Sequence, residues 1–294
     1  MTPSDPIAAD APDLRRVLAH EFADVEHRYD ERDAITYALG IGLGGNPTHE
    51  GELRFVYEKN LRVFPTFATV LCPPGPWMED PRYGINRRLS VHGAQRIEWH
   101  KPLPASGHIV GKHRTVGVVD KGPGRGALVH VQRQIFEKGS AQPSVTLLHT
   151  SFARANGGFG GSSEPVAVFA TLPPHPGEAT VEMKTHPAQA LHYRLNGDRN
   201  PLHADPATAR AAGFERPILH GLCSFGIAGH ALMVLRDNYE GDALASLECR
   251  FSAPVYPGET LAFEFWREAG GVLFRATTKE RGLTVLDNGR AVFN

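Results

Sequence analysis

Residues 193–232, YRLNGDRNPLHADPATARAAGFERPILHGLCSFGIAGHAL, contain the stretch that decides the fold. The helix predicted from Leu222 to Leu235 is apolar on all sides, and Gly221 directly precedes it. A helix without a polar face has to be enclosed by other parts of the chain. A curved sheet wrapped around the helix is the natural enclosure.

The second half of the chain repeats the order of the first half. A helical stretch at 186–195 corresponds to 31–42, and the apolar segment 216–237 corresponds to FPTFATVL at 64–71. KPLPASG at 101–107 resembles APVYPG at 253–258. Two copies of one unit are therefore expected. The predicted class is α+β, with two units in tandem, each a curved antiparallel sheet wrapped around a long apolar helix.

Turn residues and apolar alternation set the expected boundaries. Residues 1–24 are predicted to be a flexible N-terminal segment. Period-two patterns separated by glycine-rich turns predict an antiparallel meander within a first unit at 25–155. The Gly- and Pro-rich stretch 156–177 is predicted to be a linker, and 178–294 the second unit. The glycine run is expected to be a loop, since the lysine and helix of a phosphate-binding loop are absent.

Composition excludes several classes of protein. The net charge is -1, so neither nucleic acid nor an anionic membrane surface is an expected partner. No apolar run approaches the ~18 residues of a membrane span. The three cysteines, Cys72, Cys223 and Cys249, are widely spaced in apolar surroundings and are expected to be buried thiols. With no signal-peptide pattern or recognised targeting tripeptide, a cytoplasmic location is expected.

Asp198 and His203 are the candidate acid and base. Gly197 and Pro201 break any helix and let the segment curl around a small pocket. Asn200, between the two candidates, could hold a water or fix the carboxylate. The alternatives are a turn aspartate and an ordinary loop histidine. The spacing of His203, His220 and His230 fits no standard metal site, so no metal is expected.

The segment YRLNGDRNPLH at 193–203 resembles the hydratase motif of the MaoC-like, type-2 (R-specific) enoyl-CoA hydratase family in its double hot-dog form. The family usually has serine where this chain has Asn196. Weaker matches run from about Val25 to Phe293 and include HKPLP, VVDKG, GGFGG and APVYPGETL. The resemblance implies reversible syn hydration of trans-2-enoyl-CoA to (3R)-3-hydroxyacyl-CoA. It also implies that the main-chain N–H of Gly221 is the oxyanion donor.

The chemistry explains this choice of residues. Water must lose a proton as it attacks the β-carbon, the α-carbon must gain one, and charge on the thioester oxygen must be stabilised. A carboxylate and an imidazole beside one water can divide the proton work, and which of them protonates the α-carbon is left open. A helix N-terminus that begins with glycine offers unpaired N–H groups to the oxygen.

The first half lacks the acid. Its sequence places Gly42 or Gly44 where the aspartate would stand, although His49 remains. We therefore predict that the first unit is not catalytic. In the family this half accommodates the acyl tail, which implies medium-chain, long-chain or bulky acyl groups.

Two other functions stay open, a hot-dog acyl-CoA thioesterase and a non-enzymatic acyl-thioester-binding protein. The acyl-CoA is the substrate, no cofactor is expected, and a homodimer is expected. Nothing in the sequence selects among the basic residues that could meet the CoA phosphates, which are Arg87, Arg88, Lys101, Arg216 and Arg250.

Overall fold

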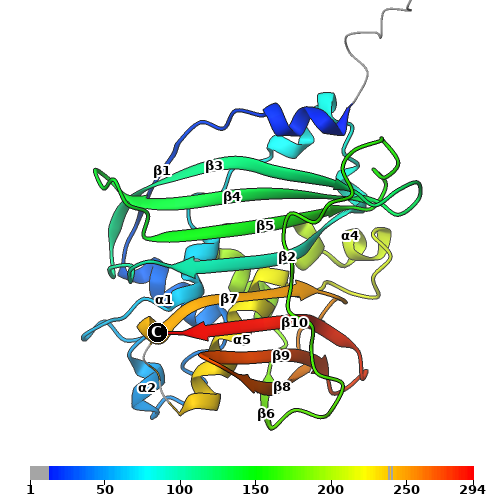
Figure 1. Cartoon of the computed structure of the whole chain (residues 1–294). Coiled ribbons are helices and arrows are strands. Elements are labelled where there is room, and N and C mark those ends of the chain that lie inside the picture. The colour runs from blue at the N-terminus through cyan, green and yellow to red at the C-terminus, as the bar shows by residue number, and fades with distance from the viewer. Residues whose placement is uncertain (1–12, 238, 240) are drawn as a thin grey trace, which may run out of the picture.

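The computed structural model describes residues 13–237, 239 and 241–294. Ten strands form one antiparallel sheet in the order β1-β3-β4-β5-β2-β7-β10-β9-β8-β6 (Figure 1). The first half supplies β1 (Val25–Tyr29), β2 (Ser90–Trp99), β3 (Gly107–Asp120), β4 (Ala127–Glu137) and β5 (Val145–Ala153). The second supplies β6 (Ala179–Lys184), β7 (Leu244–Phe251), β8 (Thr260–Glu268), β9 (Gly271–Thr278) and β10 (Thr284–Phe293).

The two halves share one strand order and meet edge to edge. Each half begins at an outer strand and ends at an inner one, in the order β1-β3-β4-β5-β2 and β6-β8-β9-β10-β7. The inner strands β2 and β7 pair from Ala94 with Arg250 to Glu98 with Ser246. The internal repeat and the α+β class predicted from the sequence are confirmed, and the two sheets are continuous.

Short helical segments connect the strands. The α-helices are α1 (Glu31–Gly40), α2 (Glu50–Leu53), α3 (Gln189–Tyr193), α4 (Pro206–Ala211) and α5 (Gly221–Arg236). The 3-10 helices are η1 (Leu14–Ala19), η2 (Pro65–Val70), η3 (Trp77–Glu79), η4 (Pro81–Tyr83), η5 (Arg87–Leu89), η6 (Arg194–Asn196), η7 (Pro201–His203) and η8 (Gly241–Ala243). None of the helices in the described ranges has the length and apolar character that crossing a membrane requires.

Helix α5 is buried along almost its whole length, as its apolar sequence requires. Every residue from 223 to 233 is buried. Glycines let the neighbouring segments approach closely, since a Cβ built on Gly226 would lie 2.6 Å from Ile41, and one on Gly229 3.2 Å from Phe64. The main core therefore combines side chains of both halves around α5.

The prediction of a long apolar helix in each unit is wrong for the first unit. The segment predicted to form it folds into η2, a 3-10 helix of six residues. The proline-rich run that follows at 73–76 prevents a longer helix. Contacts of α1 with α3 and of η2 with α5 fill the space instead, so one long helix serves both units.

The N-terminal segment differs from the flexible chain predicted for 1–24. Residues 1–12 lie outside the described residues. From residue 14 the chain forms η1, whose Leu14 and Val17 are buried in a small second core with Tyr83, Val118 and Val129. This core covers the part of the sheet formed by β3 and β4.

Asp120 fixes the glycine-rich stretch between the two halves. Its carboxylate accepts hydrogen bonds from the main-chain N–H groups of Gly122, Gly158, Gly160 and Gly161, at 2.7 to 3.3 Å. These bonds, that of Gly158 most of all, lower the pKa of Asp120. A run of N–H groups turned inward resembles an anion site, but here the chain's own carboxylate occupies it.

Beyond this loop the chain crosses the outer face of the sheet to reach β6 (Figure 1). Arg96 on β2 donates to the carbonyl of Val168, and Asn288 on β10 donates to that of Ala170. The crossing segment is therefore attached to strands of both halves.

We predict that Asp120→Ala exposes this segment to proteases. Four N–H groups lose their shared acceptor, so cleavage within 156–177 should become about tenfold faster. Limited proteolysis followed by mass spectrometry measures the rate and the position. Asp24→Ala, at an exposed carboxylate, is the control, and equal cleavage of the two variants would contradict the prediction.

Candidate active site

A cavity of about 370 Å³ lies where the two halves meet. Its second-half wall includes Asp198, Asn200, His203 and Gly221, so all four candidate residues named from the sequence line one space. The first half contributes the beginning of β2 and the end of β5. The site is therefore built across the seam between the units.

The loop from Gly197 to His203 curls because of its own residues. Gly197 has φ 107°, which ends η6 in a left-handed turn that a side chain would strain. Asp198 Oδ1 accepts the main-chain N–H of Asn200 at 3.1 Å. Asn200 Oδ1 in turn accepts the N–H of Leu202 at 3.0 Å, and Pro201 opens η7. The carboxylate is thus held by the main chain of Asn200, while the Asn200 side chain caps η7.

His203 is buried at the end of η7 with one ring nitrogen free. Its Nδ1 lies 2.8 Å from the carbonyl oxygen of Ile218, so Nδ1 carries the proton and donates. Nε2 is then an acceptor. Burial lowers the pKa of His203, although the Ile218 bond and nearby Asp198 oppose the shift. The ring is therefore neutral at pH 7 and can accept a proton.

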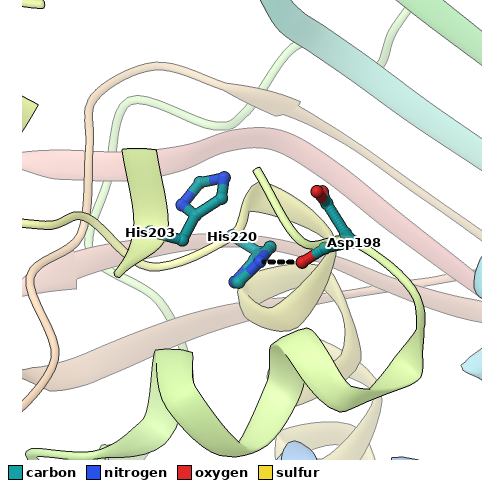
Figure 2. Close-up of side chains that lie close together, drawn as sticks. All are labelled: Asp198, His203 and His220. Atoms are coloured by element: carbon teal, nitrogen blue, oxygen red, sulfur yellow. Dashed lines mark hydrogen bonds between the residues drawn. The ribbon is translucent and has the colours of Figure 1, made fainter. Parts of the chain in front are cut away.

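His220 holds the acid and the imidazole together. Its ring stacks on that of His203 with centroids 3.7 Å apart and an interplanar angle of 26°. Its Nε2 donates to the main-chain oxygen of Asp198 at 3.1 Å (Figure 2). Burial, and the neighbouring His203 ring, lower the pKa of His220 to about 4. This positioning role was missed from the sequence, where His220 was considered only as a metal ligand.

The sequence did contain a signal for His220. It directly precedes the glycine at the start of the apolar helix. The structure then shows that His220 is the N-cap residue of α5 and that its side chain makes no capping hydrogen bond. An N-cap histidine that does not cap its helix is free to face the loop beside it.

Asp198, His203 and His220 each offer a ligand atom, and these three atoms lie within 4.8 Å of one another. A single ion between the stacked rings of His203 and His220 would lie outside the plane of both. Imidazole nitrogens hold their lone pairs in the ring plane, so this arrangement suits a metal poorly. His230 is elsewhere, 3.7 Å from buried Glu52. Asp198 and His203 are close enough to share one water. That the site binds no metal remains a prediction from the sequence.

Gly221 starts α5 beside this loop. The first N–H groups of a helix have no hydrogen-bond partner within the helix, and they form the positive end of its dipole. Gly221 and Phe251 both line the cavity, and a Cβ built on Gly221 would lie 3.4 Å from the Phe251 ring, so the glycine keeps the space between them open. The structure therefore brings an acid, an imidazole and a helix N-terminus to one cavity.

The equivalent residues of the first half have other roles. His49 caps α2, with its Nδ1 accepting the N–H of Glu52, and its ring packs against Tyr239. The N–H of Gly44 donates to Glu52 at 2.7 Å. The imidazole is thus used for a helix cap, and the positions that correspond to the aspartate are the glycines Gly42 and Gly44.

Comparison with known proteins shows that each half of the chain matches a family model. Residues 168–288 match the MaoC-like domain family, and residues 27–155 match the MFE-2 hydratase 2 N-terminal domain family. The chain is 38% identical over 287 residues to the peroxisomal enoyl-CoA hydratase 2 of Arabidopsis thaliana, covering 92% of each protein.

Two solved structures support the fold. The MaoC-like dehydratase from Phytophthora capsici superposes with a TM-score of 0.84 at 33% identity, covering 96% of this chain and 98% of that one. A Mycobacterium tuberculosis protein described as having a double hotdog fold superposes with a TM-score of 0.58 at 12% identity, covering 98% and 99%. The second likeness shows the fold alone, and the predicted tandem hot-dog arrangement is confirmed.

We predict that His220→Ala raises the pKa of His203 toward the usual value of about 6.5. Removing the stacked ring lets water reach His203, and burial is the largest cause of its lowered pKa. Titration of the histidine ring protons by NMR measures the shift. His220→Phe, which keeps the packing, should leave the pKa of His203 low, whereas an unchanged pKa in His220→Ala would exclude the stacking as its cause.

Proposed function

Because the chain belongs to the MaoC-like, type-2 enoyl-CoA hydratase family, its activity is that of an R-specific hydratase, and we propose that the cavity at the seam is the active site. The reaction is the reversible syn addition of water to trans-2-enoyl-CoA, which gives (3R)-3-hydroxyacyl-CoA. The observation that carries the proposal is the convergence of Asp198, His203 and Gly221 on one space.

In the proposed mechanism one water lies between Asp198 and His203. Nε2 of neutral His203 takes a proton from the water as its oxygen attacks the β-carbon, and Asp198 stabilises the resulting imidazolium. The same pair returns a proton to the α-carbon. Both groups lie on the side of the water, so hydroxyl and proton reach the same face of the double bond. Asn200 positions Asp198 through its main chain.

The helix N-terminus stabilises the intermediate. As water adds, negative charge moves to the thioester oxygen, and the N–H of Gly221 is placed to donate to it. In other enzymes one such donor contributes roughly 3 to 4 kcal/mol to transition-state stabilisation. A side chain at this position would occupy the space beside Phe251 where the thioester must lie.

For the acyl group we propose medium-chain, long-chain or bulky substrates. The second unit supplies an apolar wall, with Leu219, Leu222 and Val255 among its residues. The first unit was expected to accommodate the acyl tail, yet its wall is formed by mostly polar residues. Apolar contact with the chain is therefore proposed to come mainly from the second unit.

Arg87 and Arg154 are the proposed contacts for the CoA phosphates. Both are exposed and line the first-unit side of the cavity. Of the other cations considered, Lys101 and Arg216 line different cavities, and the side chain of Arg88 lies outside the described residues. Arg250 does not line the cavity. Arg154 was not selected from the sequence.

We further propose a cytoplasmic homodimer that needs neither metal nor cofactor. The three cysteines are unpaired and buried, which suits a reducing compartment. The sheet ends at β1 and β6, whose outer edges can accept a partner.

Asp198→Ala and His203→Ala should each lower the turnover of enoyl-CoA by at least about 10²-fold with the fold retained, because each removes half of the proton-transfer pair. Loss of absorbance of the conjugated thioester, over a series of chain lengths and with chiral analysis of the product, measures this. His192→Ala, at an exposed histidine of α3, should match the wild type.

The same assay distinguishes the hydratase from the two alternative functions, a thioesterase and a binding protein. Release of free CoA thiol from enoyl-CoA would indicate a thioesterase. Unchanged kinetics in Asp198→Asn would indicate a binding protein, and activity confined to crotonyl-CoA would refute the proposed acyl size.

Arg87→Ala with Arg154→Ala should raise KM for enoyl-CoA by about tenfold and leave kcat unchanged, since the phosphates lie far from the reacting carbons. The matching pantetheine thioester, which lacks the nucleotide phosphates, should show no change. Arg114→Ala, exposed and outside the cavity, is the control. A fall in kcat with both substrates would exclude a phosphate role.

A further inference from the structure

Two histidines whose rings pack closely at a tilt form part of the first-unit wall of the cavity. His92 on β2 and His149 on β5 have ring centroids 3.9 Å apart, and His92 packs on Phe251 at 4.6 Å. The same Phe251 ring is the nearest neighbour of the missing Cβ of Gly221. The histidine pair therefore lies one aromatic ring away from the proposed position of the thioester, and the proton-transfer mechanism does not use it.

Hydrogen bonds fix the tautomer of His92 and favour the same tautomer for His149. Nε2 of His92 lies 2.9 Å from the carbonyl oxygen of Ala94, which can only accept, so Nε2 donates. Nε2 of His149 lies 3.0 Å from Ser151 Oγ. The hydroxyl of Ser151 donates to Met78 Sδ at 3.6 Å, so its oxygen accepts from His149. Each ring is left with Nδ1 as an unprotonated acceptor.

The pair stays uncharged. Burial lowers the pKa of His149 to about 4, and burial together with His149 lowers the pKa of His92 well below its usual value. Two adjacent cations would repel each other in this setting. Neutral rings with free acceptors cannot form an ion pair with a carboxylate, and a plain alkyl chain would leave the acceptors unpaired.

We propose that His92 and His149 form an acceptor site that selects a substrate presenting an uncharged O–H or N–H donor beside the thioester. The site rests on the proposed function and names its substrate class. Two parts of an acyl-CoA can bring such a donor. One is a hydroxyl or similar substituent on the acyl chain, and the other is the pantetheine amide nearest the sulfur.

Binding of saturated thioesters, which cannot be hydrated, tests the site separately from catalysis. Calorimetry compares hexanoyl-CoA, 6-hydroxyhexanoyl-CoA and the amide-free propyl thioester of hexanoic acid. The proteins are the wild type, His149→Phe, His149→Asn and the exposed control His100→Phe. Phenylalanine keeps the packing and removes the acceptor, whereas the Asn oxygen restores an acceptor at the position of Nδ1.

If the donor is on the acyl chain, the wild type binds 6-hydroxyhexanoyl-CoA about five- to tenfold more tightly than hexanoyl-CoA, as expected for one hydrogen bond. His149→Phe removes the difference and His149→Asn restores it. If the donor is the pantetheine amide, His149→Phe weakens both CoA ligands equally and leaves the propyl thioester unchanged, and His149→Asn recovers the affinity.

Equal affinities of wild type and His149→Phe for every ligand, or the same losses in His100→Phe, would overturn the acceptor site. A wild type that binds selectively but hydrates no enoyl-CoA would disprove the proposed function and leave this site standing.

Discussion

The enclosure of helix α5 is the constraint on which the rest of the structure depends. A helix with no polar face has no stable position at a surface, so the sheet and the segments of the first unit close around it. Its N-terminus cannot be buried in apolar side chains, because the first N–H groups of the helix need partners. These groups open onto the cavity at the seam, which makes the end of the helix available to a ligand.

The chemistry of the site follows from how that helix end is packed. His220 ends the preceding loop, stacks on His203 and holds the main chain of Asp198. The low-dielectric surroundings that lower the pKa of His203 also keep it neutral, the state in which Nε2 can take a proton. Burial, often a cost for a polar side chain, here sets the protonation state that the reaction requires.

The two units have diverged within one topology. Their strands follow the same order, yet the first unit replaces the long helix with η2 and uses His49 to cap α2. Its contribution to the cavity is a wall that includes Arg87, His92 and His149. One unit thus supplies the reacting groups and the helix end, and the other supplies polar contacts. Continuous pairing of β2 with β7 fixes the two walls relative to each other.

The sequence by itself determined those features of the protein that depend on residues close together in the chain. The repeat, the antiparallel strands, the buried α5 and the curled loop of Asp198 and His203 all follow from local periodicity and from glycine and proline. The stacking of His220, the acceptor pair formed by β2 and β5, and the attachment of the glycine run by Asp120 join residues from separate elements, and no local pattern encodes their distance. The prolines at 73–76 limit the length of η2 in the first unit, but its contact with α5 joins two segments far apart in the sequence and is visible only in the tertiary structure.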